Sequence, residues 1–321
     1  MAVRIAFHTD TSDSRLRLMK QMGVTDVVTG MSPSSADGIC SFEDILRLRK
    51  KVDDFGLTLS VFEGVPMSDR IKLGLDGRDE DIEKLSESIR NMGRAGVPVL
   101  CYNWMVAMNW LRTSTTTPVR GGAQATTYNH AEFQRGPHTE FGEVSEDTLW
   151  TALEYFLNAI VPVAEGAGVK LAMHPDDPPL SPIRGMGRIM RSVDNFQRML
   201  DMVPSPNNGL TFCQGCWTEL GVDVPTIIKF FGEQEKIHFV HFRNLTGTLE
   251  NFTESFHDDG KQDMYEAMKA YDEVGFDGPM RPDHAPTMEG ENNDRPGYAI
   301  NGRLLAVGYM KGLCEAIKKS K

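Results

Sequence analysis

The chain has 321 residues, of which 40% are hydrophobic and 25% charged, a composition typical of a globular protein with a buried core. Its 34 basic and 45 acidic residues give a formal charge of −11, which disfavours a surface for nucleic acid or anionic membranes. The chain starts without a signal-peptide pattern, and no apolar run approaches the roughly 20 residues that span a bilayer. Five cysteines in a chain of this length suit a reducing compartment. We therefore expect a cytoplasmic protein that binds neither nucleic acid nor membranes.

Short apolar runs alternate with amphipathic stretches along the whole sequence, which predicts strands alternating with helices. Eight such pairs are the pattern of a closed parallel (β/α)8 barrel, the TIM barrel, and no linker divides the chain. We therefore predict one domain over residues 1–321. The predicted strands are 3–7, 24–29, 57–62, 97–102, 169–173, 209–212, 236–242 and 278–282. The predicted helices are 12–22, 41–55, 79–94, 145–167, 192–203, 224–231, 263–274 and 303–319.

Residues 105–143, after the fourth predicted strand, show neither the periodicity of a strand nor that of an amphipathic helix, and they are rich in Thr, Gly, Gln, His and Arg. We interpret them as a long irregular loop insertion, because loops of this length in compact domains are usually functional or disordered. We expect this insertion to act as a lid or as a contact between two copies of the chain in a homodimer.

Four successive strands of the second half end in side chains that bind metals: His174, Cys213, His241 and Asp283. In a barrel the carboxyl ends of all strands meet at one face, so these groups are expected to converge. Two imidazoles, a thiolate and a carboxylate suit Zn²⁺, Mn²⁺ or Fe²⁺. A single histidine at a strand end is more often a structural residue than a metal ligand. The prediction of a metal site therefore depends on metal-binding side chains at four successive strand ends.

Cys213 also begins a C-x-x-C motif with Cys216. A redox pair would place this motif at the start of a helix in a thioredoxin-like unit, and a structural zinc site would need a second pair that the sequence lacks. We therefore favour Cys213 as a ligand of a mixed site.

Other polar residues near these strand ends are candidates for acid–base chemistry. His284 follows Asp283 directly and is expected to face a bound substrate, and Tyr298 is a second candidate for proton transfer. Arg243 is expected to receive an anionic group. Asp176, beside Asp177 and three prolines, is expected to brace a turn or contact substrate, and we interpret His8 as a loop or surface residue.

Apart from His8, these residues lie in segments that resemble the mannonate dehydratases, a family of xylose isomerase-like barrels. The resemblance covers most of the chain, and its histidine-proline-diaspartate-diproline and arginine-proline-aspartate-histidine motifs are specific in combination. The resembling segments are 101–105, 110–113, 172–179, 209–213, 238–244, 281–284 and 296–298.

The resemblance implies a hydro-lyase that converts D-mannonate to 2-keto-3-deoxy-D-gluconate in hexuronate breakdown. It implies an Mn²⁺ or Fe²⁺ site at the four strand-end residues, with His284 and Tyr298 as acid and base in an order that stays open. The substrate-binding residues that we predict are Asn103, Asp176 and Arg243.

Other functions fit the same sequence. An isomerase or epimerase on this barrel would keep the mass of its substrate, whereas a dehydratase removes water. A catalytically silent barrel would bind metal and sugar acid as a sensor. A metal-dependent endonuclease is disfavoured by the acidic balance.

Overall fold

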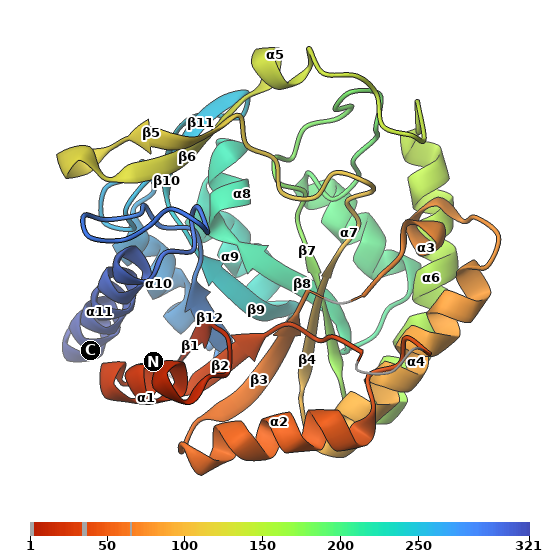
Figure 1. Ribbon diagram of the computed structural model, residues 1–321, viewed down its shortest axis with the longest axis horizontal. Helices are drawn as coiled ribbons and strands as arrows, with labels where there is room; N and C mark the ends of the chain where they lie inside the picture. Colours follow the sequence, from red (N-terminus) through yellow and green to blue (C-terminus); the bar gives the residue numbers. More distant parts are fainter. Residues whose placement is uncertain (1–2, 34–36, 65) are drawn as a thin grey trace.

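The structure, a computed structural model, describes residues 3–33, 37–64 and 66–321 (Figure 1). Eight strands of these residues close into a parallel barrel in the order β1-β12-β9-β8-β7-β4-β3-β2. The predicted TIM barrel is thus confirmed. Its strands are β1 (Arg4–His8), β2 (Asp26–Thr29), β3 (Thr58–Glu63), β4 (Val99–Asn103), β7 (Lys170–His174), β8 (Asn208–Cys213), β9 (Ile237–Phe242) and β12 (Pro279–Pro282).

Helices surround the barrel and cover its outer face (Figure 1). The last helix lies beside the first and close to β1, which completes the ring. The longer helices are α1 (Asp13–Met22), α2 (Phe42–Asp54), α4 (Arg78–Ala95), α6 (Glu146–Ala167), α7 (Val193–Met202), α9 (Val224–Gly232), α10 (Met264–Glu273) and α11 (Ile300–Lys319). Each corresponds to a predicted helix within a few residues. Among the described residues, three short α-helices were not predicted: α3 (Asp69–Leu73), α5 (His130–Phe133) and α8 (Gln214–Glu219).

Local sequence signals explain where these helices begin and end. Helix α6 begins after Ser145, whose hydroxyl accepts a hydrogen bond from the backbone N–H of Thr148 at 3.1 Å. It ends at Gly168, whose φ of 68° is a left-handed conformation that glycine adopts without strain. The chain then turns directly into β7, so this cap helps to set the position of His174 at the other end of that strand.

The barrel has two apolar layers. Small and β-branched side chains fill its interior together with one aromatic ring, that of Phe239. A larger cluster lies between the strands and the helices, and it includes Phe212 and Trp217, whose rings stack 5.6 Å apart. Because the alternate residues of each strand are committed to these two layers, polar groups are concentrated at the strand ends.

The insertion after the fourth barrel strand is not irregular as predicted. It contains β5 (Ser114–Pro118), a 3₁₀ turn η1 (Arg120–Gly122), β6 (Gln124–Asn129) and the short helix α5 (His130–Phe133). The two strands pair with each other, and β6 also pairs with β11. Polar, Thr-rich strands without clear alternation carry little signal of their own.

The partner strands of this second sheet come from the loop after β9. They are β10 (Leu245–Thr248) and β11 (Asn251–Glu254), and the sheet order is β10-β11-β6-β5. A small apolar cluster that includes Tyr128 and Phe252 packs beneath the sheet. Two loops far apart in sequence therefore form one antiparallel sheet beside the barrel mouth (Figure 1). In the residues that the structure describes, no helix has the length and apolarity to cross a membrane.

Candidate active site

A cavity of about 290 Å³ lies at the carboxyl ends of the barrel strands. Its lining combines titratable groups with the aromatic side chains of Tyr102, Trp110 and Tyr298. The lining includes His8, Glu63, Asn103, Asn109, Trp110, His174, Asp177, His241, Arg281, Asp283, His284 and Tyr298.

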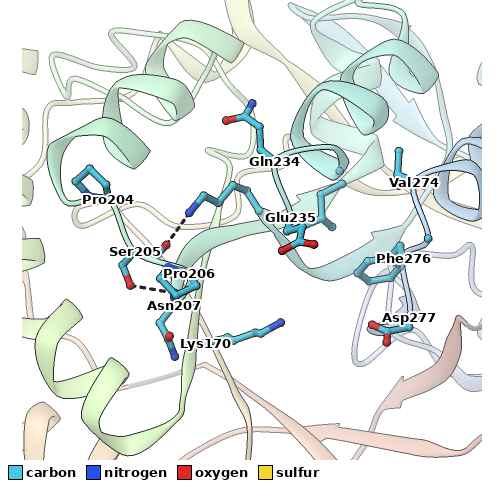
Figure 2. Close-up of a pocket in the computed structure, with 14 residues that line it drawn as sticks. Lys170, Pro204, Ser205, Pro206, Asn207, Gln234, Glu235, Val274, Phe276 and Asp277 are labelled. Carbon is cyan, nitrogen blue, oxygen red and sulfur yellow. Dashed lines mark hydrogen bonds between the residues drawn. The ribbon is translucent and has the colours of Figure 1, made fainter.

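Another cavity, of about 710 Å³, lies at the opposite, amino-terminal mouth of the barrel (Figure 2). Lys170, Asn207 and Asp277 are among its lining residues, and Lys236 donates to the backbone carbonyl of Ser205 at 2.6 Å. No histidine or cysteine of the described chain lines it. The side chains suited to proton transfer or metal binding thus gather at the carboxyl-end cavity, although it is the smaller of the two.

The four predicted ligands converge at this mouth. His174 and Cys213 are the last residues of β7 and β8, His241 lies near the end of β9, and Asp283 follows β12. Donor atoms of the first three lie within 4.8 Å of one another. The carboxylate Oδ2 of Asp283 lies 3.7 Å from His241 Nδ1 and 3.8 Å from Cys213 Sγ. Strand ends separated by up to 109 positions therefore bring nitrogen, sulfur and oxygen donors together.

The two imidazoles are oriented so that ring nitrogens face each other. His174 Nδ1 lies 2.6 Å from the carbonyl of Pro175, so Nδ1 carries the proton of the neutral ring and Nε2 its lone pair. That Nε2 lies 3.1 Å from His241 Nδ1. On the far side of its ring, His241 Nε2 lies 3.5 Å from a carboxylate oxygen of Glu63. A carbonyl or carboxylate behind each imidazole is the arrangement that orients histidine ligands of metals.

The charge states of these groups suit a cation. Burial opposes ionisation of Cys213, but hydrogen bonds from Cys216 and the two imidazoles hold the pKa of its thiol well below the ordinary value. Burial also opposes ionisation of Asp283, whose pKa is nevertheless held well below the ordinary value by its neighbours His284 and Arg281. For His174, burial opposes protonation, but the hydrogen bond with the thiolate raises the pKa to about 9. The donor set thus fits a divalent metal, which would replace the proton that the site otherwise retains.

The two candidate acid–base residues lie beside the same carboxylate. The hydroxyl of Tyr298 donates to Asp283 Oδ1 at 3.4 Å, and His284 Nε2 lies 3.6 Å from that oxygen. Their rings meet edge to face with centroids 5.1 Å apart. Burial, followed by the charge of Asp283, raises the pKa of the Tyr298 hydroxyl. Two groups able to exchange protons therefore face one region of the cavity.

Of the predicted substrate-binding residues, Asn103 lines the cavity. Its Oδ1 accepts hydrogen bonds from Lys72 Nζ at 3.3 Å and from the backbone N–H of Met105 at 3.0 Å. Burial, which outweighs the nearby carboxylates, lowers the pKa of Lys72 to about 8.

Asp176, predicted to contact substrate, does not line the cavity. Its Oδ2 accepts from the backbone N–H of Met190 at 2.8 Å, and its own N–H donates to the Met190 carbonyl at 2.9 Å. The side chain braces the loop after β7, as its neighbouring prolines suggested. The next residue, Asp177, faces the cavity instead.

Arg243 is also placed differently from the prediction that it receives an anionic substrate. It is fully buried and does not line the cavity. Its guanidinium donates to Asp177 at 2.8 Å, to Glu219 at 2.7 Å, and to Glu254 at 2.6 and 2.9 Å. These three carboxylates occupy the donors that a substrate would need.

The same arginine explains the C-x-x-C motif. Cys213 precedes α8 as its N-cap, and the sulfurs of Cys213 and Cys216 each lie 3.6 Å from Arg243 Nη1. A Cβ on Gly215 would collide with the Arg243 side chain. All five cysteines are free. The small residue and the two sulfurs thus pack around a buried cation.

Sequence reasoning missed several cavity residues. Arg281 joins Glu63, at 2.8 and 2.5 Å, to Asp283 at 2.8 Å and so orients a predicted ligand. Glu63 directly follows the third predicted strand, and that position was the available signal. His8, interpreted as a loop or surface residue, lines the cavity, and burial lowers its pKa to about 4.

Comparison with known proteins gives the same family over nearly the whole chain. A family model described as D-mannonate dehydratase (UxuA) matches residues 1–141 and 134–321. A mannonate dehydratase of Thermotoga maritima is 38% identical, covering 93% of this chain and 92% of the relative. Mannonate dehydratase 2 of Halalkalibacterium halodurans is 36% identical, covering 94% of this chain and 95% of the relative.

Solved structures agree. The crystal structure of mannonate dehydratase from Streptococcus suis serotype 2 superposes with a TM-score of 0.93 at 33% identity, covering 99% of this chain and 94% of the other. An L-ribulose 3-epimerase, at 15% identity and a TM-score of 0.64, shares the fold.

Proposed function

This chain belongs to the D-mannonate dehydratase family, and from that membership we propose that it removes water from D-mannonate to form 2-keto-3-deoxy-D-gluconate. The observation that carries the proposal is the convergence of the four candidate metal ligands, Asp283 among them, with His284 and Tyr298. An elimination of this kind needs both charge stabilisation and proton transfer, and the cavity contains groups for both.

We propose that His174, Cys213, His241 and Asp283 hold Mn²⁺ or Fe²⁺. Support comes from the facing imidazole nitrogens, the lowered pKa values of the thiol and the carboxyl, and the groups that orient each histidine. When bound, a divalent cation supplies positive charge that stabilises the negative charge developing on the substrate.

Two proton transfers complete the proposed reaction. A base takes the C2 proton, the electron pair of that C–H bond forms a C2–C3 double bond, and the C3–O bond breaks. An acid protonates the departing C3 hydroxyl, which leaves as water, and the enol tautomerises to the 2-keto acid. His284 and Tyr298 are the proposed base and acid pair, because their polar atoms lie 3.6 and 3.4 Å from one carboxylate oxygen at the cavity.

Asn103 is the residue that we propose for orienting the sugar acid. Its Oδ1 is used by Lys72 and Met105, which leaves the amide Nδ2 to donate to a substrate oxygen. The protein is further proposed to act in the cytoplasm, and to pair as a homodimer through residues 105–143. Size-exclusion chromatography with light scattering tests the homodimer.

The test of function is direct. Chelator-treated protein reloaded with Mn²⁺ or Fe²⁺ and incubated with D-mannonate should yield a product lighter by one water, detected by mass spectrometry. A product of unchanged mass would instead support an isomerase or epimerase. If D-mannonate raises the Tm but no aldonate of a tested panel is turned over, the result would support a sensor and contradict the dehydratase.

A further inference from the structure

A buried carboxylate from the second sheet reaches one of the proposed catalytic residues. Glu254, the last residue of β11, is 1% exposed, and its Oε1 lies 3.1 Å from His284 Nδ1. Glu254 pairs in register with Leu245 across the β10–β11 hairpin, which fixes its backbone. The contact joins a loop of the second sheet to the end of β12.

Two arginines hold this carboxylate in place. Arg112 Nη2 and Arg243 Nη2 each donate to Glu254 Oε1 at 2.6 Å, and Arg243 Nε donates to Oε2 at 2.9 Å. Burial opposes ionisation of Glu254, but the two guanidinium groups hold its pKa below the ordinary value. An ionised carboxylate only accepts hydrogen bonds, so the proton of the His284 contact belongs to Nδ1.

The ring of His284 is held on its other sides as well. Trp110 packs against it with ring centroids 5.1 Å apart, and Tyr298 meets it edge-on at the same distance. With Nδ1 directed at Glu254, the opposite nitrogen, Nε2, is directed toward the cavity and Asp283. The orientation of the ring therefore determines which nitrogen meets the substrate.

We infer that Glu254 is a positioning residue that fixes His284 with its proton on Nδ1 and its lone pair on Nε2, the form that accepts the C2 proton. This inference rests on the proposed function and deepens it, because it assigns His284 as the base and leaves Tyr298 as the acid. Arg112 and Arg243 act through Glu254, and neither lines the cavity.

The inference also gives the second sheet a role in the reaction. Arg112 precedes β5 and Glu254 ends β11, so the hairpins on both sides of the sheet meet at this carboxylate. The insertion is thus part of the structure that orients the base.

Glu254→Gln tests the inference, with Glu219→Gln as the matched control. Both glutamates are buried and accept from Arg243, but only Glu254 contacts His284. The glutamine amide oxygen would stay where both arginines donate, but without the negative charge of the carboxylate it holds the proton on Nδ1 less strongly and allows the tautomer with the proton on Nε2. We expect kcat of Glu254→Gln to fall on the order of 100-fold with KM changed less than about threefold, and Glu219→Gln to stay within about threefold of wild type. Equal losses in the two variants would contradict the inference.

A second readout needs no turnover. Nitrogen NMR shifts of the His284 ring in the diamagnetic Zn²⁺-loaded chain, assigned by their loss in His284→Asn, report which nitrogen carries the proton. The wild type should show a protonated Nδ1, and Glu254→Gln should shift toward a protonated Nε2. A protonated Nε2 in the wild type would overturn the inference even if Glu254→Gln fails to fold. Because this measurement uses no substrate, failure of the proposed function would leave it unaffected.

Discussion

Replacing Arg243 by methionine distinguishes a buried charge from a substrate-binding arginine. The side chain is fully buried among Asp177, Glu219 and Glu254. The pKa of Glu219 is raised well above its ordinary value, first by burial and then by the charge of Asp177, so this carboxyl keeps its proton. The pKa values of Asp177 and Glu254 are lowered, in spite of burial, by the two arginines, so both carry charge. Without Arg243, Arg112 alone faces two buried negative charges.

The expected loss of stability in Arg243→Met follows from this count of buried charges. Leaving one buried charge without its partner destabilises a protein by about 3–5 kcal/mol. Unfolding entropy of about 2.1 cal/mol/K per residue gives roughly 0.7 kcal/mol/K for this chain. Arg243→Met should therefore lower Tm by about 4–7 °C, measured by differential scanning calorimetry at neutral pH.

Arg120 offers a matched control at the surface. It also makes two hydrogen bonds to one carboxylate, that of Asp258, both at 3.0 Å, but its side chain is 43% exposed. An exposed pair contributes about 0–1 kcal/mol, so Arg120→Met should change Tm by less than about 2 °C. A Tm of Arg243→Met within about 1 °C of wild type, with KM for D-mannonate raised tenfold or more, would refute the reasoning and restore Arg243 as a substrate ligand.

Four further predictions concern the site and the acid stability. Mn²⁺ at a hundredfold excess over its Kd should stabilise the chain by about 2.7 kcal/mol, roughly 4 °C in Tm, and equal stabilisation of His174→Ala would argue against the metal site. Cys213→Ser should weaken Mn²⁺ binding at least about tenfold in chelator competition, whereas Cys216→Ser should not, and the reverse order would exclude Cys213 as ligand. Tyr298→Phe should lose on the order of 100-fold in kcat while retaining its metal, and an active Tyr298→Phe would remove the proposed acid. Burial lowers the pKa of His238 to about 4, so the unfolded chain, with a pKa of about 6.5, binds this proton more tightly. The free energy of unfolding should therefore fall as pH drops from about 6.5 to 4, and this residue should account for about 2 kcal/mol of the loss at pH 5. In urea unfolding at a series of pH values, His238→Gln should lack this part of the pH dependence.

Much of the fold could be predicted because the pattern is local. Apolar runs of four to seven residues, separated by helices with three- and four-residue spacing, identified the barrel strands and the main helices within a few residues. The second sheet escaped prediction because β5 and β6 are polar. Strand β6 pairs with β5 and also with β11, which lies more than 120 positions further along the chain.

The predicted ligands gathered for a reason that the sequence contains. Parallel strands of one barrel end at one rim, so His174, Cys213 and His241 at successive strand ends had to become neighbours. The sequence could not place Arg243, because a side chain just past a strand end can turn either toward the cavity or beneath it. The Arg243 side chain lies beneath the cavity, where it pairs with the buried side chains of Asp177, Glu219 and Glu254.

The sequence by itself determined the alternation of strands and helices, the single barrel and the rim on which the polar residues lie. These follow from side-chain periodicity and from the direction of parallel strands, which act over a few residues. Only the tertiary structure decided that Asp177 rather than Asp176 meets the cavity, and that Arg281 faces it while Arg243 does not. It alone joined Arg112 to Glu254 across 142 positions. Such contacts depend on how charges are neutralised inside the folded protein, and no local pattern encodes that balance.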